Sequence, residues 1–154
     1  WRDERATTEA VDRDSRLHTG DLGHLDGDGY LFVTGRTKSL IVLDSGKKVQ
    51  PEEVEGALAT SALFQESCVV GWRAPDAGRR SGEQVCAVVV PTAELTEAAA
   101  TEEVRRLTAG LSPFKRPTVV RVHPGPLPQT AKRSVRRIEV VRFLDQGAQD
   151  RARP

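Results

Sequence analysis

The sequence predicts a small α+β domain, in which helices cover a mixed β-sheet, preceded by a separate β-hairpin segment. Two observations support the domain and a third supports the hairpin. Apolar runs of strand length alternate with amphipathic helical stretches between residues 39 and 145. The run at 83–90 is apolar at both alternating sets of positions, which indicates a strand buried on both faces. An Asp-Gly-Asp-Gly run at 26–29 stands between two short apolar segments, a pattern typical of a hairpin.

The first 16 residues are densely charged and have no periodic apolar face, so we expect a loop or a loosely attached arm. After them, residues 22–25 are predicted to pair with 30–34 around the acidic turn. Alternating aspartates also begin calcium-binding loops. Because the closing glutamate and the flanking helices of such a loop are missing, a turn is favoured over a calcium site.

The next stretch, GRTKSLIVLDSGKKVQPEEVE at 35–55, predicts a second hairpin over 39–49 followed by a helix. Gly46 can adopt the positive φ that such a turn needs. Pro51 suits the first helical turn, where the helix dipole also favours the two glutamates that follow. The apolar face of this helix is expected to contain Val54, Leu58 and Ala62.

Three further strands are expected, at 64–72, 83–90 and 118–122, with a turn at 74–78 between the first two. Two of these runs contain the cysteines, Cys68 and Cys86, which we interpret as small buried hydrophobic residues with free thiols.

Two more helices complete the prediction. One is capped by Thr101, is ended by Pro113 and has its apolar face at Val104, Leu107 and Leu111. The other covers 136–144, and the tail from Gln146 is expected to fray. The inward residues of this last helix are expected to be Ile138, Val141 and Leu144.

Composition limits the classes of function. The 154 residues contain 23 basic and 22 acidic side chains, so no overall field attracts nucleic acid or anionic lipid. No apolar run reaches the length of a membrane span, and the amino terminus lacks the apolar core of a signal peptide. We therefore expect a cytoplasmic protein. Neither a CxxC pair nor a His/Cys cluster is present, so no metal site is predicted.

A few polar residues are candidates for a site. The carboxylate of Asp21, after Thr-Gly, suits a ribose diol, although aspartate is also common in turns. The planar guanidinium of Arg36 suits ribose or phosphate oxygens, or a surface ion pair. The basic loop at 132–137 suits a polyphosphate, a nucleic-acid backbone or simply solvent; the near-neutral net charge and an aromatic content of 5% count against nucleic acid.

The order of the motifs is more specific than any one of them. TGD at 19–21, DGDGYLFVTGRTK at 26–38, SGKKVQPEEVE at 45–55, and LPQT followed by Arg-Arg at 127–137 resemble the carboxy-terminal part of adenylate-forming enzymes. These enzymes include acyl-CoA synthetases, peptide-synthetase adenylation domains and luciferases. The resemblance covers about residues 17–144 and is greatest to the fatty acyl-CoA synthetases.

This resemblance implies a role for several residues. Asp21 matches the aspartate that holds the ribose hydroxyls of ATP, and Arg36 matches an arginine that also contacts the nucleotide. Lys38 matches the hinge about which the small domain turns between an adenylating pose and a thioester-forming pose. Gly46 matches a glycine that lets the backbone approach the pantetheine arm of CoA. In such enzymes a carboxylic acid attacks the α-phosphorus of Mg-ATP, and the CoA thiol then displaces AMP.

The resemblance also implies a division of the chain. Residues 1–35 match the end of a large amino-terminal domain, 36–38 the hinge, 39–145 the small mobile domain and 146–154 a tail. The phosphate-gripping loop, the magnesium site and the acid pocket belong to the large domain, which we expect in cis or in trans. Residues 1–154 alone are therefore not expected to adenylate an acid. The apolar side chains of 17–34 would lack their usual cover, which predicts self-association or a mobile arm.

One position departs from the family pattern. The late motif of the family contains a lysine that reaches the acyl carboxylate and the α-phosphate, and ungapped counting places Ser134 there. Lys132, two residues earlier, is a candidate to replace it, and Arg133 is a weaker one. Ser134 also keeps a second hypothesis open, a non-catalytic relative that binds nucleotide or a partner protein. A third hypothesis, a nucleic-acid-binding module, would use the 132–137 loop.

Overall fold

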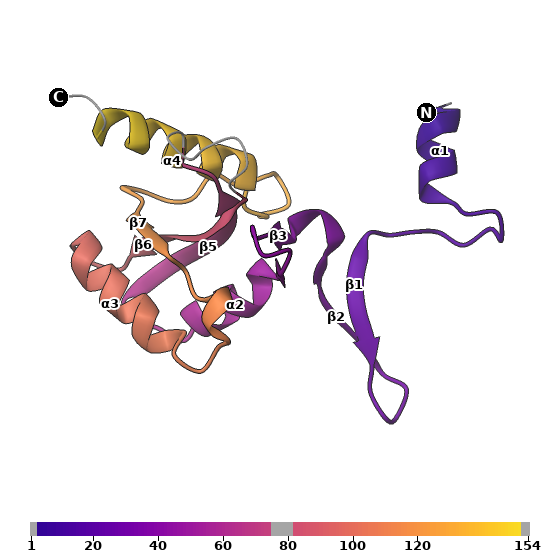
Figure 1. The fold of residues 1–154 in the computed structure, drawn as a ribbon, viewed down its shortest axis with the longest axis horizontal. Coiled ribbons are helices and arrows are strands. Elements are labelled where there is room, and N and C mark those ends of the chain that lie inside the picture. The colour runs from indigo at the N-terminus through magenta and orange to yellow at the C-terminus, as the bar shows by residue number, and fades with distance from the viewer. Residues whose placement is uncertain (1–2, 75–81, 152–154) are drawn as a thin grey trace. The chain divides into compact units, whose positions relative to one another are not determined.

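The computed structural model describes residues 3–74 and 82–151. The chain divides into two compact units, Trp1–Lys38 and Ser39–Pro154. The first contains a short helix and a hairpin, and the second contains a sheet with its covering helices (Figure 1).

The first unit begins with a helix, α1 (Glu4–Ala10), where the sequence predicted a loop. The cause is local. Asp3 caps the helix by accepting a hydrogen bond from the Ala6 amide, at 2.9 Å, and the Thr7 hydroxyl donates to the Asp3 carbonyl. Seven residues with a good cap are enough for two turns without any apolar periodicity.

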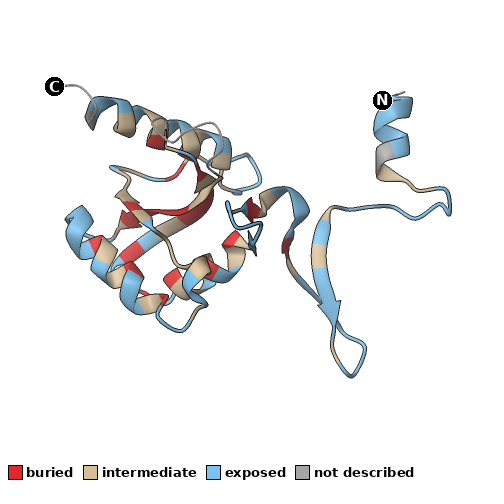
Figure 2. Cartoon of the chain, viewed as in Figure 1, coloured by how far each residue is buried: buried red, intermediate tan, exposed pale blue. Residues whose placement is uncertain are grey.

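The predicted hairpin follows and is confirmed: β1 (Asp21–Leu25) pairs antiparallel with β2 (Leu31–Arg36). Asp26 organises its turn, because its Oδ1 accepts hydrogen bonds from the amides of Asp28 and Tyr30. This carboxylate is thus used as a turn residue, as expected. Most of the hairpin is exposed within this unit (Figure 2). Its exposed residues include the large apolar ones Leu25, Tyr30, Leu31, Phe32 and Val33. Self-association through them stays a prediction.

The second unit has the predicted mixed sheet. β5 (Phe64–Trp72) pairs antiparallel with β6 (Gln84–Pro91), and β6 pairs parallel with β7 (Val119–Val122). The small hairpin of β3 (Ile41–Val42) and β4 (Lys48–Val49) precedes it. The helices are α2 (Pro51–Leu58), α3 (Glu97–Leu107) and α4 (Arg137–Arg151), with single 3-10 turns at Thr37–Ser39 and Pro113–Lys115.

Both faces of the sheet are buried. α2 and α3 cover one face and α4 covers the other (Figure 1). Successive residues of β5 and β6 alternate between the two faces, which explains why β6 is apolar at every position from Val85 to Pro91. The cluster under α2 and α3 includes Val69, Val85, Ala87, Val89 and Val104, and that under α4 includes Cys68, Val70, Trp72, Cys86, Val88, Val140 and Leu144.

Several predicted details were wrong. Thr96 caps α3 by accepting from the Ala99 amide, whereas Thr101 lies inside the helix and donates to the Glu97 carbonyl. Ala62 lies beyond the end of α2 and is exposed. Most of the predicted 74–78 turn lies outside the described residues.

The last helix also differs from its prediction. α4 continues to Arg151, past the predicted end at Leu144. Val140 and Leu144 are its buried residues, and Val141 is half-buried against the same cluster as predicted, while Ile138 is 72% exposed. The spacing of four residues between Val140 and Leu144 places both on the side of the helix that faces the sheet.

The two cysteines are free and buried, as predicted. Burial raises the pKa of each thiol from 9.0 to about 12. We therefore expect a chromogenic disulfide reagent at pH 8 to label neither thiol until the protein unfolds, and both thereafter. The thiols of the unfolded chain ionise near pH 9. The contribution of the two thiols to the free energy of unfolding is therefore fully present below pH 9 and is lost as the pH rises from 9 to 12. Rapid labelling of the native protein would contradict this prediction.

Candidate functional site

Asp21 and Arg36 face each other across the open end of the first hairpin. They are register partners at the ends of β1 and β2, and Arg36 Nε lies 2.8 Å from Asp21 Oδ1. The turn before β1 fixes the aspartate: its amide donates to Thr19 Oγ1, and Gly20 adopts a φ of +76°. The Gly20 carbonyl accepts from the Thr37 amide at 2.8 Å, which ties this turn to the end of β2.

The pair is open to a ligand. The Asp21 side chain is 33% exposed and that of Arg36 is 67% exposed. Among the described contacts the pair uses only Nε of the guanidinium and Oδ1 of the carboxylate. A second carboxylate oxygen and the terminal guanidinium nitrogens are therefore left for a diol and an anionic oxygen. This donor and acceptor set fits a nucleoside phosphate.

Lys38 lies in the same unit and shares a pocket with Asp21. The pocket has a volume of about 780 Å³. It is lined by Ala6, Ala10, Leu17, His18, Thr19, Gly20, Asp21, Thr37 and Lys38. The structure therefore brings three of the predicted site residues, Asp21, Arg36 and Lys38, to one end of the hairpin.

Gly46 forms the tip of the small hairpin in the second unit. Its φ is +74°, its amide donates to the Leu43 carbonyl at 2.8 Å, and the Leu43 amide donates to the Lys47 carbonyl. A Cβ at Gly46 would meet no atom within 4 Å. Within this unit, glycine is therefore required at position 46 because of its positive φ, and not because a side chain would collide with a neighbouring atom. The exposed tip leaves room for a ligand to lie against the backbone.

Lys132 and Ser134 lie on a closed loop, residues 130–134. The Thr130 amide donates to the Ser134 carbonyl at 2.8 Å, the Ser134 amide donates to Thr130 Oγ1 at 3.2 Å, and Gln129 and Val135 form a bridge. Arg133 adopts a φ of +60°, which completes the reversal. The backbone of the loop is thus fixed, whereas the side chains of Lys132, Arg133 and Ser134 are exposed and make no described polar contact.

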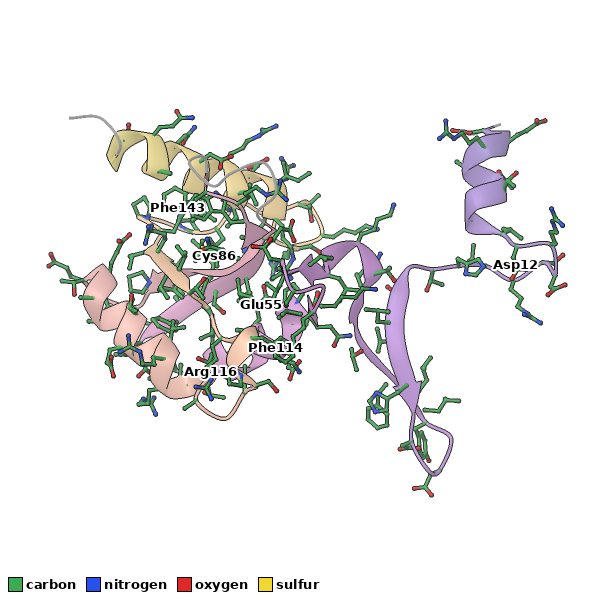
Figure 3. All side chains as sticks on the ribbon, in the orientation of Figure 1. Asp12, Glu55, Cys86, Phe114, Arg116 and Phe143 are labelled. Carbon is green, nitrogen blue, oxygen red and sulfur yellow. The ribbon has the colours of Figure 1, made fainter. Side chains whose placement is uncertain are left out.

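Arg137 was predicted to extend this basic loop but instead points into the unit. Its guanidinium binds both carboxylate oxygens of Glu55, at 2.6 and 3.0 Å, and also the Val69 carbonyl. Glu55, labelled in Figure 3, in turn accepts from the Val69 amide at 2.7 Å, which joins α2 to β5. Burial lowers the pKa of Arg137, but the hydrogen bonds and the charge of Glu55 outweigh this effect and raise the pKa above that of a free guanidinium.

Three glutamates with structural importance were not singled out from the sequence: Glu55, Glu66 and Glu83. Each bonds to a backbone amide of another segment. Glu55 was interpreted only as part of a helix start, and the others as strand residues. No local pattern identifies them, because their partners lie 14, 61 and 41 residues away in the sequence.

The family description "AMP-binding enzyme C-terminal domain" matches residues 53–133. With the mixed sheet and the exposed hairpin-end site, this defines the class of the protein. The chain belongs to the family of AMP-binding enzyme C-terminal domains, as its motifs predicted.

The matched relatives are CoA ligases. An indoleacetate–CoA ligase of Aromatoleum aromaticum is 39% identical over 140 residues, which are 91% of this chain and 26% of the relative. The long-chain-fatty-acid–CoA ligase FadD15 of Mycobacterium tuberculosis is 46% identical over 78 residues, 51% of this chain and 13% of the relative. The chain thus spans about a quarter or less of the length of these relatives.

The fold matches solved adenylate-forming enzymes. The crystal structure of ATP-bound MatB from Rhodopseudomonas palustris is 30% identical, with a TM-score of 0.79, over 96% of this chain and 28% of that one. This likeness confirms the predicted fold class. Among the described residues, no helix has the length and apolarity needed to cross a bilayer.

Proposed function

We propose that this chain acts as the mobile carboxy-terminal part of an ATP-dependent acyl-CoA ligase, in the cytoplasm. The observation that carries the proposal is the exposed Asp21–Arg36 ion pair. This pair precedes, in the sequence, the region that matches the family, residues 53–133. Its carboxylate suits the ribose hydroxyls of ATP or AMP, and its guanidinium suits a nucleotide oxygen. Lys38, at the boundary between the two units, is the proposed hinge.

The proposed reaction has two steps. In the first, a carboxylate oxygen of the acid attacks the α-phosphorus of ATP, pyrophosphate leaves and an acyl-adenylate forms. In the second, the CoA thiol gives up its proton and attacks the acyl carbon, and AMP leaves. The closed loop, which contains Lys132 and Ser134, is assigned to the first step, and the Gly46 tip to the second. Each would be brought to the reacting atoms by closure of the second unit.

The acid is proposed to be a fatty acid, on the resemblance of the 35–55 stretch to fatty acyl-CoA synthetases. The named relatives favour a wider set, since one acts on indoleacetate and another on long-chain fatty acids. Selection among acids is assigned to a pocket in the large domain. The large domain that provides it, and the magnesium bound with ATP, are proposed partners of this chain.

The central test is pyrophosphate exchange into ATP with a panel of fatty, arylacetic and cinnamic acids. We expect acid-dependent exchange from the complete ligase, with residues 1–154 and the large domain together. Residues 1–154 alone should show none, because adenylyl transfer requires charge contacts that this part lacks. Exchange by residues 1–154 alone would contradict the proposed division of labour.

A second candidate function is a non-catalytic relative that binds a nucleotide or a protein. Ser134 is the observation that favours it, since serine carries no charge at the position matched to the lysine of the family. AMP release with the same acids separates the two candidates. The complete protein should bind AMP but release none from ATP if the second candidate is correct.

A further inference from the structure

Glu66 holds the entry to the closed loop. It lies near the start of β5, opposite Val90 of β6. Its Oε2 accepts from the Leu127 amide at 3.1 Å and from Gln129 Nε2 at 3.5 Å. Leu127 is buried in the cluster under α4. The chain is therefore fixed at Leu127 by packing and by this carboxylate, three residues before the loop reverses at Thr130.

Glu83 holds the Gly46 hairpin in a similar way. Its Oε2 accepts from the Val42 amide at 3.1 Å, and its own amide donates to the Val42 carbonyl at 3.3 Å. Two glycines make this close approach possible. A Cβ at Gly71 would overlap the Glu83 carboxylate, and one at Gly82 would lie 2.6 Å from the Asp44 amide. The hairpin is thus attached to the sheet beside residues 71 and 83.

The two attachments are independent of each other. Glu66 lies opposite Val90, whereas Glu83 precedes Gln84, the partner of Trp72 at the other end of the β5–β6 ladder. At about 3.3 Å per residue, the seven residues from Val90 back to Glu83 span about 23 Å. Changes at sites so far apart, with no shared partner, are expected to act separately.

We propose that Glu66 and Glu83 are positioning residues for different half-reactions, Glu66 for adenylation and Glu83 for thioester formation. The inference rests on the proposed function, which assigns the 130–134 loop to the first step and the Gly46 tip to the second. Each carboxylate accepts a backbone hydrogen bond that fixes a functional segment, and neither needs to touch a substrate. A small displacement of such a segment is enough to slow the step that it serves.

The test measures each half-reaction in the complete ligase. Adenylation is followed by pyrophosphate exchange, and thioester formation is followed by adding CoA to the preformed acyl-adenylate. We expect E66A to slow adenylation by about 10- to 100-fold and E83A to slow thioester formation by a similar factor, each with little effect on the other step. E66Q and E83Q keep an acceptor oxygen and should recover most of the lost rate, which separates positioning from charge.

The control is E94A, which removes an exposed carboxylate that makes no described contact. It should change neither half-reaction. If E66A and E83A lower the melting temperature and slow both steps equally, the two glutamates are merely structural and the inference is wrong. If the alanine variants do not fold, equal loss of both steps in the glutamine variants is the contradicting result. A wild-type ligase that forms no adenylate contradicts the proposed function, and this inference with it.

Discussion

Replacing Lys132 with alanine in the complete ligase is expected to slow adenylation by about 100- to 1000-fold, the usual effect of losing one preorganised charge contact at a transition state. Lys132 is exposed and has no described polar contact, so its ammonium group is available to a carboxylate or a phosphate. Pyrophosphate exchange at saturating acid and ATP measures the effect.

The structure indicates how Lys132 would act in place of Ser134. A two-residue shift of the backbone would break the Thr130–Ser134 hydrogen bonds and the bridge between Gln129 and Val135. The flexible lysine side chain offers an easier route, since it can reach past the loop tip while the backbone stays in place.

Two further variants make this prediction decisive. R133A removes the neighbouring cation and should have a much smaller effect than K132A. S134K in the K132A background places an ammonium at the position matched to the family lysine, and should restore most of the rate. Unchanged adenylation in K132A would exclude Lys132 as the source of the cation.

Replacing Arg137 with alanine is expected to reduce the free energy of unfolding by about 3 kcal/mol, the low end for breaking a buried ion pair, because both partners keep some exposure to water. The substitution leaves the Glu55 carboxylate without its bidentate partner and the Val69 carbonyl without a donor. Urea unfolding followed by the fluorescence of Trp72, the last residue of β5, which is buried against α4, measures the change.

Arg136 provides the matched control for this measurement. It is the neighbouring residue, just before α4, and its side chain is more exposed; among the described contacts that side chain pairs only with Glu139 of α4, at 2.9 Å. R136A should therefore cost about 0.5 kcal/mol or less. R137K keeps the charge but loses the fork geometry and should fall between the two. Equal effects of R136A and R137A would show that the Glu55 pair does not stabilise the fold.

The sheet was predictable because its signal is local. Continuous apolar runs bounded by turn residues identified β5, β6 and β7, and Gly46 and Pro51 marked a turn and a helix start. The errors arose where a local cap or a distant partner decides the structure. Asp3 forms a helix from a charged segment, and the packing of α4 on the sheet selects Val140 over Ile138.

The site was predictable to a smaller extent. Asp21 was predicted to follow a glycine turn, as it does, but that Arg36 ends β2 and contacts Asp21 depends on the hairpin register. Arg137 was assigned to a solvent-exposed basic loop because its neighbours are basic. Its partner, Glu55, lies 82 residues earlier, and only the folded packing of α2, β5 and α4 brings them together.

The Glu55–Arg137 pair also has a mechanical consequence. Glu55 joins α2 to β5, and Arg137 joins the first residue of α4 to both. The Gly46 hairpin leads directly into α2, and the closed loop leads directly into α4. A rotation at the proposed hinge would therefore move the Gly46 hairpin and the closed loop together as one rigid body. The position of one segment relative to the reacting atoms then determines the position of the other.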